Sequence, residues 1–116
     1  MPDPSDTGST LANRARAYLH SNCSQCHRPG GPTSGTLDFR YTTTLANTNA
    51  CNATPASGDL GITGGRLITP GNAALSIVPA RMNRRDANGM PPLGSTLVDN
   101  DGVTLIQQWI NSLAGC

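Results

Sequence analysis

The stretch Cys23-Ser24-Gln25-Cys26-His27 carries the strongest chemical signal in this sequence. Side chains three positions apart lie on the same side of a helical turn, so the two thiols point the same way. The imidazole of His27 follows immediately, and imidazole is a common metal ligand that suits iron among other metals. The pattern therefore predicts one turn that presents two thiols and one imidazole to a single bound group.

Three classes of site use a Cys-x-x-Cys pair. A thioredoxin-like redox pair needs a βαβ context, which this sequence lacks. A zinc site needs a second pair of ligands, and the remaining candidates are badly spaced for one: Cys51, Cys116 and His20. Cys-x-x-Cys-His is the attachment signature of a c-type haem. We therefore predict that the two motif cysteines hold one haem covalently and that His27 ligates its iron.

The composition is that of a small, loop-rich domain. At 116 residues the chain has the length of one domain. Aromatic residues make up only 3% of it, whereas glycine and proline number 13 and 9. A domain of this size buries roughly two-thirds of its unfolded surface, and few large side chains are available here to fill a core. The large apolar surface of a haem would take their place.

The charges and the hydropathy argue against two classes of partner. All eight basic residues are arginine, the formal net charge is +1 and no basic run occurs, so nucleic-acid binding is not expected. No stretch approaches the ~20 apolar residues of a membrane span. The polar start, Met1-Pro2-Asp3-Pro4, lacks the pattern of a signal peptide, and we expect the sequence to be that of a mature protein.

A helix is predicted just before the motif. Residues 1–10 are polar and are expected to form a flexible linker, followed by one domain over residues 11–116. Ser9 or Thr10 is expected to cap the helix that begins at Leu11. Its apolar stripe, at helical spacing, consists of Leu11, Ala15, Tyr18 and Leu19.

The clearest helix is predicted at the end of the chain. Residues 99–101 supply N-cap candidates, and Gly115 lies where a C-cap glycine is expected. One apolar stripe runs between them, formed by Val103, Ile106, Trp109, Ile110 and Leu113.

The middle of the chain is predicted to be mostly irregular. Residues 28–69 are rich in glycine, threonine, asparagine and proline. Residues 72–75 are expected to form one turn, after which Ser76 caps a short helix with Pro79 near its start. Paired prolines keep residues 89–94 out of a helix. Because no alternating strand pattern appears, the predicted fold is all-α with long loops.

This order of features resembles the class I c-type cytochromes. More narrowly, Met90-Pro91-Pro92-Leu93-Gly94 followed by Trp109-Ile110 is similar to single-haem domains that are often fused to periplasmic or secreted dehydrogenases and hydrolases. The resemblance implies a cytochrome c fold, in which a few helices and long loops wrap around one covalent haem. It also implies that the helices over 11–22 and 102–113 interlock.

The resemblance assigns two further contacts to the haem ligands. Met90 falls on the distal ligand, whereas Met82, on the short helix, is expected to fill the core. A proline carbonyl after the motif is expected to hold the ring nitrogen of His27. Pro32 is the best match for it, and Pro29 is the alternative.

Other side chains receive supporting roles. His20 is expected to be a surface histidine. Arginine pairs well with the two haem propionates, and Arg66 and Arg81 rank first for that role. Trp109 is expected to pack in the core against the haem edge. The remaining arginine candidates are Arg40, Arg84 and Arg85.

These assignments predict an electron carrier and not an enzyme, since ligation by both His27 and Met90 leaves no open position on the iron. A thioether ligand favours the ferrous state and raises the reduction potential. The expected partners are a donor dehydrogenase and an acceptor cytochrome or oxidase, in the periplasm or outside the cell. The resemblance to fused modules also allows this domain to be one part of a larger oxidoreductase. The alternative is a haem enzyme or small-ligand sensor with a labile Met90.

The remaining two cysteines have no role in haem binding. An exported protein seldom keeps free thiols, so we predict a disulfide between Cys51 and Cys116. A second alternative to the electron carrier is a non-haem module in which all four cysteines form two disulfides.

Overall fold

The structure, a computed structural model, describes residues 1–33, 35–91 and 97–116. Helices are the only regular elements of this part of the chain, which confirms the all-α prediction. The β-type pairing in this part of the chain consists of two isolated parallel bridges, between Cys51 and Ile68 and between Arg66 and Ser76. None of the helices described is long and apolar enough to cross a membrane. The chain falls into two compact units, Met1–Ala50 and Cys51–Cys116.

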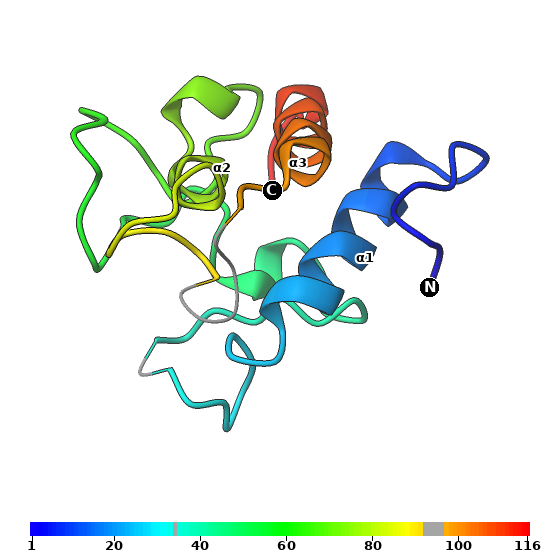
Figure 1. Cartoon of the computed structure of the whole chain (residues 1–116), viewed down its shortest axis with the longest axis horizontal. Coiled ribbons are helices and arrows are strands. Elements are labelled where there is room, and N and C mark those ends of the chain that lie inside the picture. Colours follow the sequence, from blue (N-terminus) through cyan, green and yellow to red (C-terminus); the bar gives the residue numbers. More distant parts are fainter. Residues whose placement is uncertain (34, 92–96) are drawn as a thin grey trace. The chain divides into compact units, whose positions relative to one another are not determined.

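The first unit is organised by α1, which spans Leu11–Cys23 (Figure 1). The hydroxyl of Thr10 accepts a hydrogen bond from the N–H of Asn13, so Thr10 is the N-cap, as one of the two predicted candidates. The buried residues of α1 are Ala15, Ala17 and Leu19. Two members of the predicted stripe, Ala15 and Leu19, are buried, and the other two, Leu11 and Tyr18, are half-buried. The prediction did not include Ala17, which is buried on the opposite side of the helix.

Residues 1–10, which were expected to form a linker, form two successive turns. The Asp3 carboxylate accepts hydrogen bonds from the N–H and the hydroxyl of Ser5, and Asp6 accepts one from the N–H of Gly8. Asparagine and aspartate commonly fix turns in this way. Arg14 of α1 then donates to the carbonyl of Pro4 at 2.8 Å, which ties these turns to the helix.

In the second unit, the predicted turn and short helix are both present. The 3₁₀ turn η2 spans Ala73–Leu75, and α2 spans Ile77–Met82. Pro79 lies in the first turn of α2, where its missing N–H costs no intrahelical bond. Ser76 is the N-cap residue, but its hydroxyl donates to the carbonyl of Asn72 and accepts from the N–H of Thr69. It therefore ties the preceding loop together instead of capping the helix.

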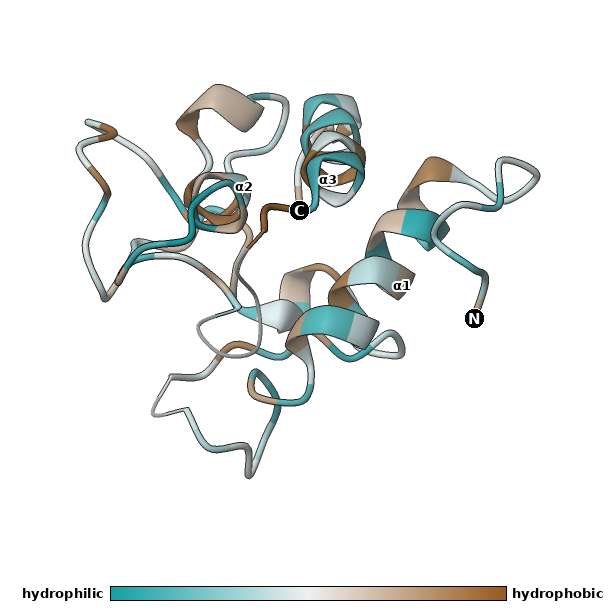
Figure 2. Ribbon diagram, viewed as in Figure 1, coloured by the Kyte–Doolittle hydropathy of each residue, from teal (hydrophilic) through white to brown (hydrophobic). Residues whose placement is uncertain are grey.

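The last helix, α3, spans Asn100–Ser112 and packs beside α2 and η2 (Figure 1). Asp99 is its N-cap and accepts from the N–H of Gly102 at 3.0 Å. Apolar and polar residues lie on different sides of the helix (Figure 2), and the buried ones include Val103, Leu105, Ile106, Trp109 and Ile110. The stripe prediction holds for its first four members, whereas Leu113 is only half-buried.

The predicted C-cap glycine is wrong. The chain turns extended at Leu113, directly after the helix, with φ −75° and ψ 129°. The hydroxyl of Ser112 donates to the carbonyl of Trp109 and occupies one of the carbonyls that a C-cap would satisfy. Beyond Leu113 the chain runs to Cys116, which forms a disulfide with Cys51. The Cα atoms of this pair are 5.9 Å apart. It is the disulfide predicted for the two cysteines outside the motif.

Candidate functional site

The motif residues 23–27 form one tight turn at the end of α1. The N–H groups of Cys26 and His27 both donate to the carbonyl of Cys23, at 3.2 and 2.8 Å. Ser24 caps the helix by donating its N–H and its hydroxyl to the carbonyl of His20. The helix end therefore positions all three functional side chains through local backbone bonds, on the single turn that their spacing predicts.

The two motif thiols are unpaired. Cys23 is half-buried and Cys26 is exposed, and neither belongs to a disulfide. Burial, with a smaller contribution from neighbouring Cys26, raises the pKa of the Cys23 thiol to about 12. Reactive redox cysteines have lowered pKa values, so Cys23 is unlike the thiol of a thioredoxin-type pair. The alternative of a module with two disulfides also fails, since only Cys51 and Cys116 are bonded.

Burial favours the neutral form of the His27 imidazole, and no described atom is hydrogen-bonded to its Nδ1. Burial lowers the pKa of His27, which keeps the ring uncharged near neutral pH. Its Nδ1 atom is buried, and no described atom pairs with it. The ring of Phe39 lies against it edge to face, with ring centroids 5.9 Å apart and ring planes at 79°. A neutral imidazole with an unused nitrogen is in the state that a metal ligand requires.

The structure does not contain the bond that the resemblance implies between His27 Nδ1 and the Pro32 carbonyl. Residues 28–33 fold back on the motif instead: Gly31 donates its N–H to the carbonyl of Arg28, and the Thr33 hydroxyl donates to the carbonyl of Cys26. Pro32 is exposed in this short loop. A Cβ atom at Gly31 would lie 2.5 Å from the Cys26 carbonyl oxygen, so this close approach requires glycine.

His20 is a structural histidine, and the prediction of a surface role is wrong. Its Nδ1 accepts a hydrogen bond from the N–H of Tyr41 at 3.0 Å, and the side chain is half-buried. The segment around Tyr41 is thereby tied to α1. Neither this contact nor the one between Phe39 and His27 could be predicted from the sequence, because each joins positions more than ten residues apart without any periodic pattern. Phe39 is, however, the only phenylalanine of the chain, which is a usable signal.

The second unit contains the two methionines whose roles were compared. Met82 lies on α2 and is 6% exposed, as expected of a core residue. Met90 is half-buried in the loop after α2. Its N–H donates to the Arg81 carbonyl at 2.9 Å, and its carbonyl accepts from the Arg85 guanidinium at 3.2 Å. The rest of the predicted 89–94 stretch, from Pro92 onward, lies outside the described residues.

Most of the candidate arginines are engaged with the protein itself. Arg81, ranked first for a propionate together with Arg66, donates to the carbonyls of Asn88, Ser57 and Gly58. The other three candidates also have protein partners: Arg40 pairs with Asp38, Arg84 pairs with Asp86, and Arg85 donates to four carbonyls.

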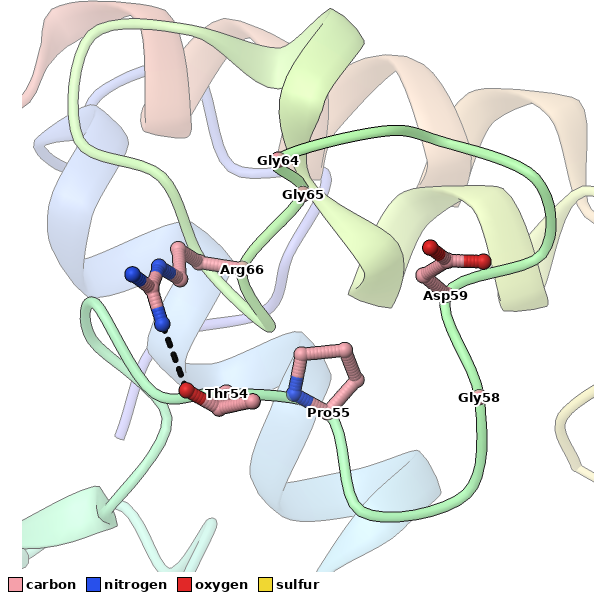
Figure 3. Close-up of a pocket in the computed structure, with 7 residues that line it drawn as sticks. All are labelled: Thr54, Pro55, Gly58, Asp59, Gly64, Gly65 and Arg66. Atoms are coloured by element: carbon pink, nitrogen blue, oxygen red, sulfur yellow. Dashed lines mark hydrogen bonds between the residues drawn. The ribbon is translucent and has the colours of Figure 1, made fainter.

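Arg66 stands apart from these. Its guanidinium donates to a hydroxyl, that of Thr54, and the side chain is exposed. It lines an open pocket of about 490 Å³ in the second unit, with Asp59 on the opposite wall (Figure 3). Glycine-rich turns form the rest of the wall, so the pocket has one cation and one carboxylate among largely backbone surroundings. Of the two first-ranked arginines, Arg66 is the one not committed to carbonyl oxygens.

Trp109 is 2% exposed on the buried side of α3, as predicted for a core residue. Within the described ranges, no group of three or more histidine, cysteine, aspartate or glutamate side chains is arranged to hold a metal ion. Comparisons with models of protein families, with curated proteins and with solved structures find no match to this chain.

Proposed function

We propose that this chain is a single-electron carrier of the c-type cytochrome class, with one haem c held covalently by Cys23 and Cys26. The observation that carries the proposal is the motif turn. Two thiols outside any disulfide and an imidazole whose Nδ1 has no partner among the described residues extend from one turn at the end of α1, and burial favours the neutral form of that imidazole. This is the donor set that covalent haem attachment and axial ligation require.

The other two cysteines provide an internal contrast that supports the proposal. Cys51 and Cys116, 65 positions apart, are joined by a disulfide, whereas Cys23 and Cys26, much closer in sequence, are not. The near pair is therefore available for thioether bonds, and the distant pair serves as a cross-link. In addition, burial disfavours the charged form of the Cys23 thiol, which argues against disulfide exchange as its role.

The proposed roles of the residues follow from their chemistry. When bound, the haem supplies the one-electron iron couple. His27 is the proximal ligand, and Met90 is proposed as the distal ligand from the resemblance. Arg66 would balance propionate charge, and Trp109 would contribute to a dry apolar setting, which strengthens electrostatic effects on the potential.

The proposal includes a cytochrome c fold and a periplasmic or extracellular setting. Such a carrier would receive electrons from a donor dehydrogenase and pass them to an acceptor cytochrome or oxidase. The formal net charge of +1 predicts weak electrostatic steering toward either partner.

Haem attachment is tested directly by mass. The protein is produced in a bacterial periplasm that is competent for cytochrome c maturation, denatured and weighed. We expect the polypeptide mass plus one haem, and a low-spin visible spectrum after reduction. A double variant, Cys23→Ser with Cys26→Ser, should lose the added mass, whereas Cys51→Ser with Cys116→Ser should keep it. A haem-free wild-type mass would refute the proposal.

Electron transfer is tested by rapid mixing. The reduced protein should be oxidised quickly, one electron per haem, by a small oxidant or a second cytochrome. Carbon monoxide and cyanide should bind slowly or not at all, because both axial positions are filled. Rapid binding of either ligand, or turnover with peroxide at enzyme-like rates, would favour the alternative of an enzyme or sensor with a labile Met90.

A further inference from the structure

Residues 38–43, which we call the 38–43 clamp, are fastened to α1 by side chains of that helix. Arg16 donates to the carbonyl of Arg40 at 3.0 Å and also to the carbonyl of Thr43. His20 accepts the N–H of Tyr41 at 3.0 Å, one turn further along the helix. The clamp therefore runs beside the last turns of α1, toward the turn that carries the motif.

The clamp is also braced internally by one carboxylate. Asp38, which is buried, accepts hydrogen bonds from the N–H and the guanidinium of Arg40, the latter at 3.0 and 2.8 Å. It accepts a further bond from the hydroxyl of Thr43 at 2.9 Å. These bonds close the segment into a compact loop and leave Phe39, between Asp38 and Arg40, with little freedom to move.

Phe39 contacts His27 in two ways. Its N–H donates to the His27 carbonyl at 2.9 Å, and its ring lies edge to face with the imidazole at a centroid distance of 5.9 Å. The Phe39 side chain is only 3% exposed. Aromatic rings prefer edge-to-face and offset arrangements over a face-to-face stack, so such a pair favours particular ring orientations.

The usual means of orienting a metal-bound histidine is absent here. In most such sites the second ring nitrogen donates to a carboxylate or a carbonyl, which fixes the rotation of the ring. The Nδ1 of His27 is buried and has no described partner. Because no hydrogen bond from a described atom to Nδ1 sets the ring plane, packing must set it, and Phe39 is the aromatic ring that the structure places against the imidazole.

We infer that Phe39 is the positioning residue for the His27 imidazole and that the 38–43 clamp holds Phe39 in place. The inference rests on the proposed function, since the ring plane matters to the iron only when His27 is its ligand. It assigns a role in ligand orientation to four residues outside the motif: Phe39 directly, and Arg16, His20 and Asp38 through the clamp.

The test uses the oxidised, haem-loaded protein and electron paramagnetic resonance, whose low-spin g values depend on the plane of the axial imidazole. Phe39→Leu keeps an apolar core residue but removes the ring. We expect it to retain covalent haem and a low-spin spectrum while its g values shift or split into more than one set. Phe39→Tyr keeps the ring and should restore the single wild-type set. Tyr41→Phe is the matched control, because the hydrogen bond from Tyr41 to His20 comes from the backbone N–H and survives the substitution.

A second variant keeps the test decisive if Phe39→Leu does not fold, as judged by thermal unfolding. Arg16→Gln removes two hydrogen bonds to the clamp and leaves the core unchanged, and it should broaden the wild-type signal. If Phe39→Leu folds and keeps the wild-type g values and line widths, the inference is overturned. If only Arg16→Gln folds, the same wild-type signal in that variant overturns it. Neither result would affect the proposed function. A wild-type protein without haem would refute the proposed function, and this inference with it.

Discussion

The turn that carries His27 and the loop that carries Met90 are built in different ways. His27 follows a helix of 13 residues, and its backbone N–H is bonded to Cys23, four positions earlier. Met90 follows a helix of only six residues, and its surroundings are held by guanidinium groups that reach backbone carbonyls. Local backbone hydrogen bonds form the first region, whereas in the second a backbone bond from the Met90 N–H to the Arg81 carbonyl is supplemented by long arginine side chains.

This difference separates what each region tolerates. A motif turn that extends a helix depends on that helix. It also depends on Gly31, because a larger residue there would clash with the Cys26 carbonyl. A loop held by Arg81 and Arg85 depends on those two side chains and on Gly89, where the backbone passes close to the carbonyl of Arg84. The expected effects of mutation in the two regions follow from this comparison.

The largest contrast is expected between two methionines of the second unit. Met90→Ala should abolish the far-red sulfur-to-iron charge-transfer band and lower the reduction potential, because a thioether ligand is lost. Met82→Ala should leave both properties nearly unchanged but cost about 2–5 kcal/mol of stability, as is typical of a buried methionine. Visible spectra, potentiometry and denaturant unfolding of both variants measure these effects. An exchange of the two outcomes would make Met82 the ligand.

The disulfide of the second unit is expected to have the next largest effect. It closes a loop with a sequence separation of 65 residues, and in the chain-entropy model such a loop is worth up to about 4 kcal/mol. Cys51→Ser with Cys116→Ser should therefore lower the free energy of unfolding by about that amount while haem attachment persists. Thiol titration of the unreduced wild-type protein should find neither of these cysteines. Two reactive thiols with haem in place would show that the cross-link does not form.

Two glycines test the regions in parallel. A Cβ at Gly31 would lie 2.5 Å from the Cys26 carbonyl oxygen, and one at Gly89 would lie 2.4 Å from that of Arg84. Each alanine variant should cost about 1–3 kcal/mol, the usual range for overpacking. Gly31→Ala should reduce the yield of attached haem, and Gly89→Ala should weaken the Met90 band instead. Gly35→Ala, where a Cβ meets nothing, is the control and should match wild type in both assays.

The smallest effect concerns acid. Hydrogen bonds from Arg40 hold the pKa of Asp38 below its usual value. A lowered pKa in the folded state means that the charged carboxylate stabilises the fold above the unfolded pKa of about 3.9, and that this contribution is lost as the pH falls below it. When the pH falls from 5 to about 3, the free energy of unfolding of the Asp38→Asn variant should therefore decrease less than that of the wild-type protein. Urea unfolding at both pH values measures the difference.

A matched aspartate gives the control for that experiment. Asp86 pairs with Arg84 at the same sequence spacing, but its side chain is 54% exposed, against 9% for Asp38. Exposed ion pairs contribute little to stability. Asp86→Asn should therefore change the acid response less than Asp38→Asn, and an equal change would mean that burial of the clamp carboxylate has no energetic consequence.

The same comparison explains what the sequence could predict. Thr10, Asp99 and Pro79 are local signals, and each marks the start of an observed helix. Gly115 was a local signal as well, but Ser112 satisfies the carbonyl of Trp109 and the chain extends at Leu113 before the glycine is reached. Other residues near the end of a helix, here Ser112, can satisfy its last carbonyls before a C-cap glycine does, and the apolar pattern does not reveal which of them will.

The candidate site divides in the same way. The turn at residues 23–27 was predictable, because the bonds that form it, from the N–H groups of Cys26 and His27 to the Cys23 carbonyl, span three and four positions. The clamp was not predictable, since Arg16 reaches carbonyls 24 and 27 positions away and His20 accepts from a residue 21 positions away. These contacts depend on how an irregular loop returns to the helix, which no periodicity encodes. The commitment of Arg81 to loop carbonyls was hidden for the same reason.

The arginine-to-carbonyl bonds of Arg81 and Arg85 bear on the response to salt. Each joins a charged donor to a neutral amide oxygen, so a rise in ionic strength screens no pair of opposite charges there. The loops that these bonds hold should accordingly keep their shape at salt concentrations that weaken the exposed Arg84–Asp86 ion pair.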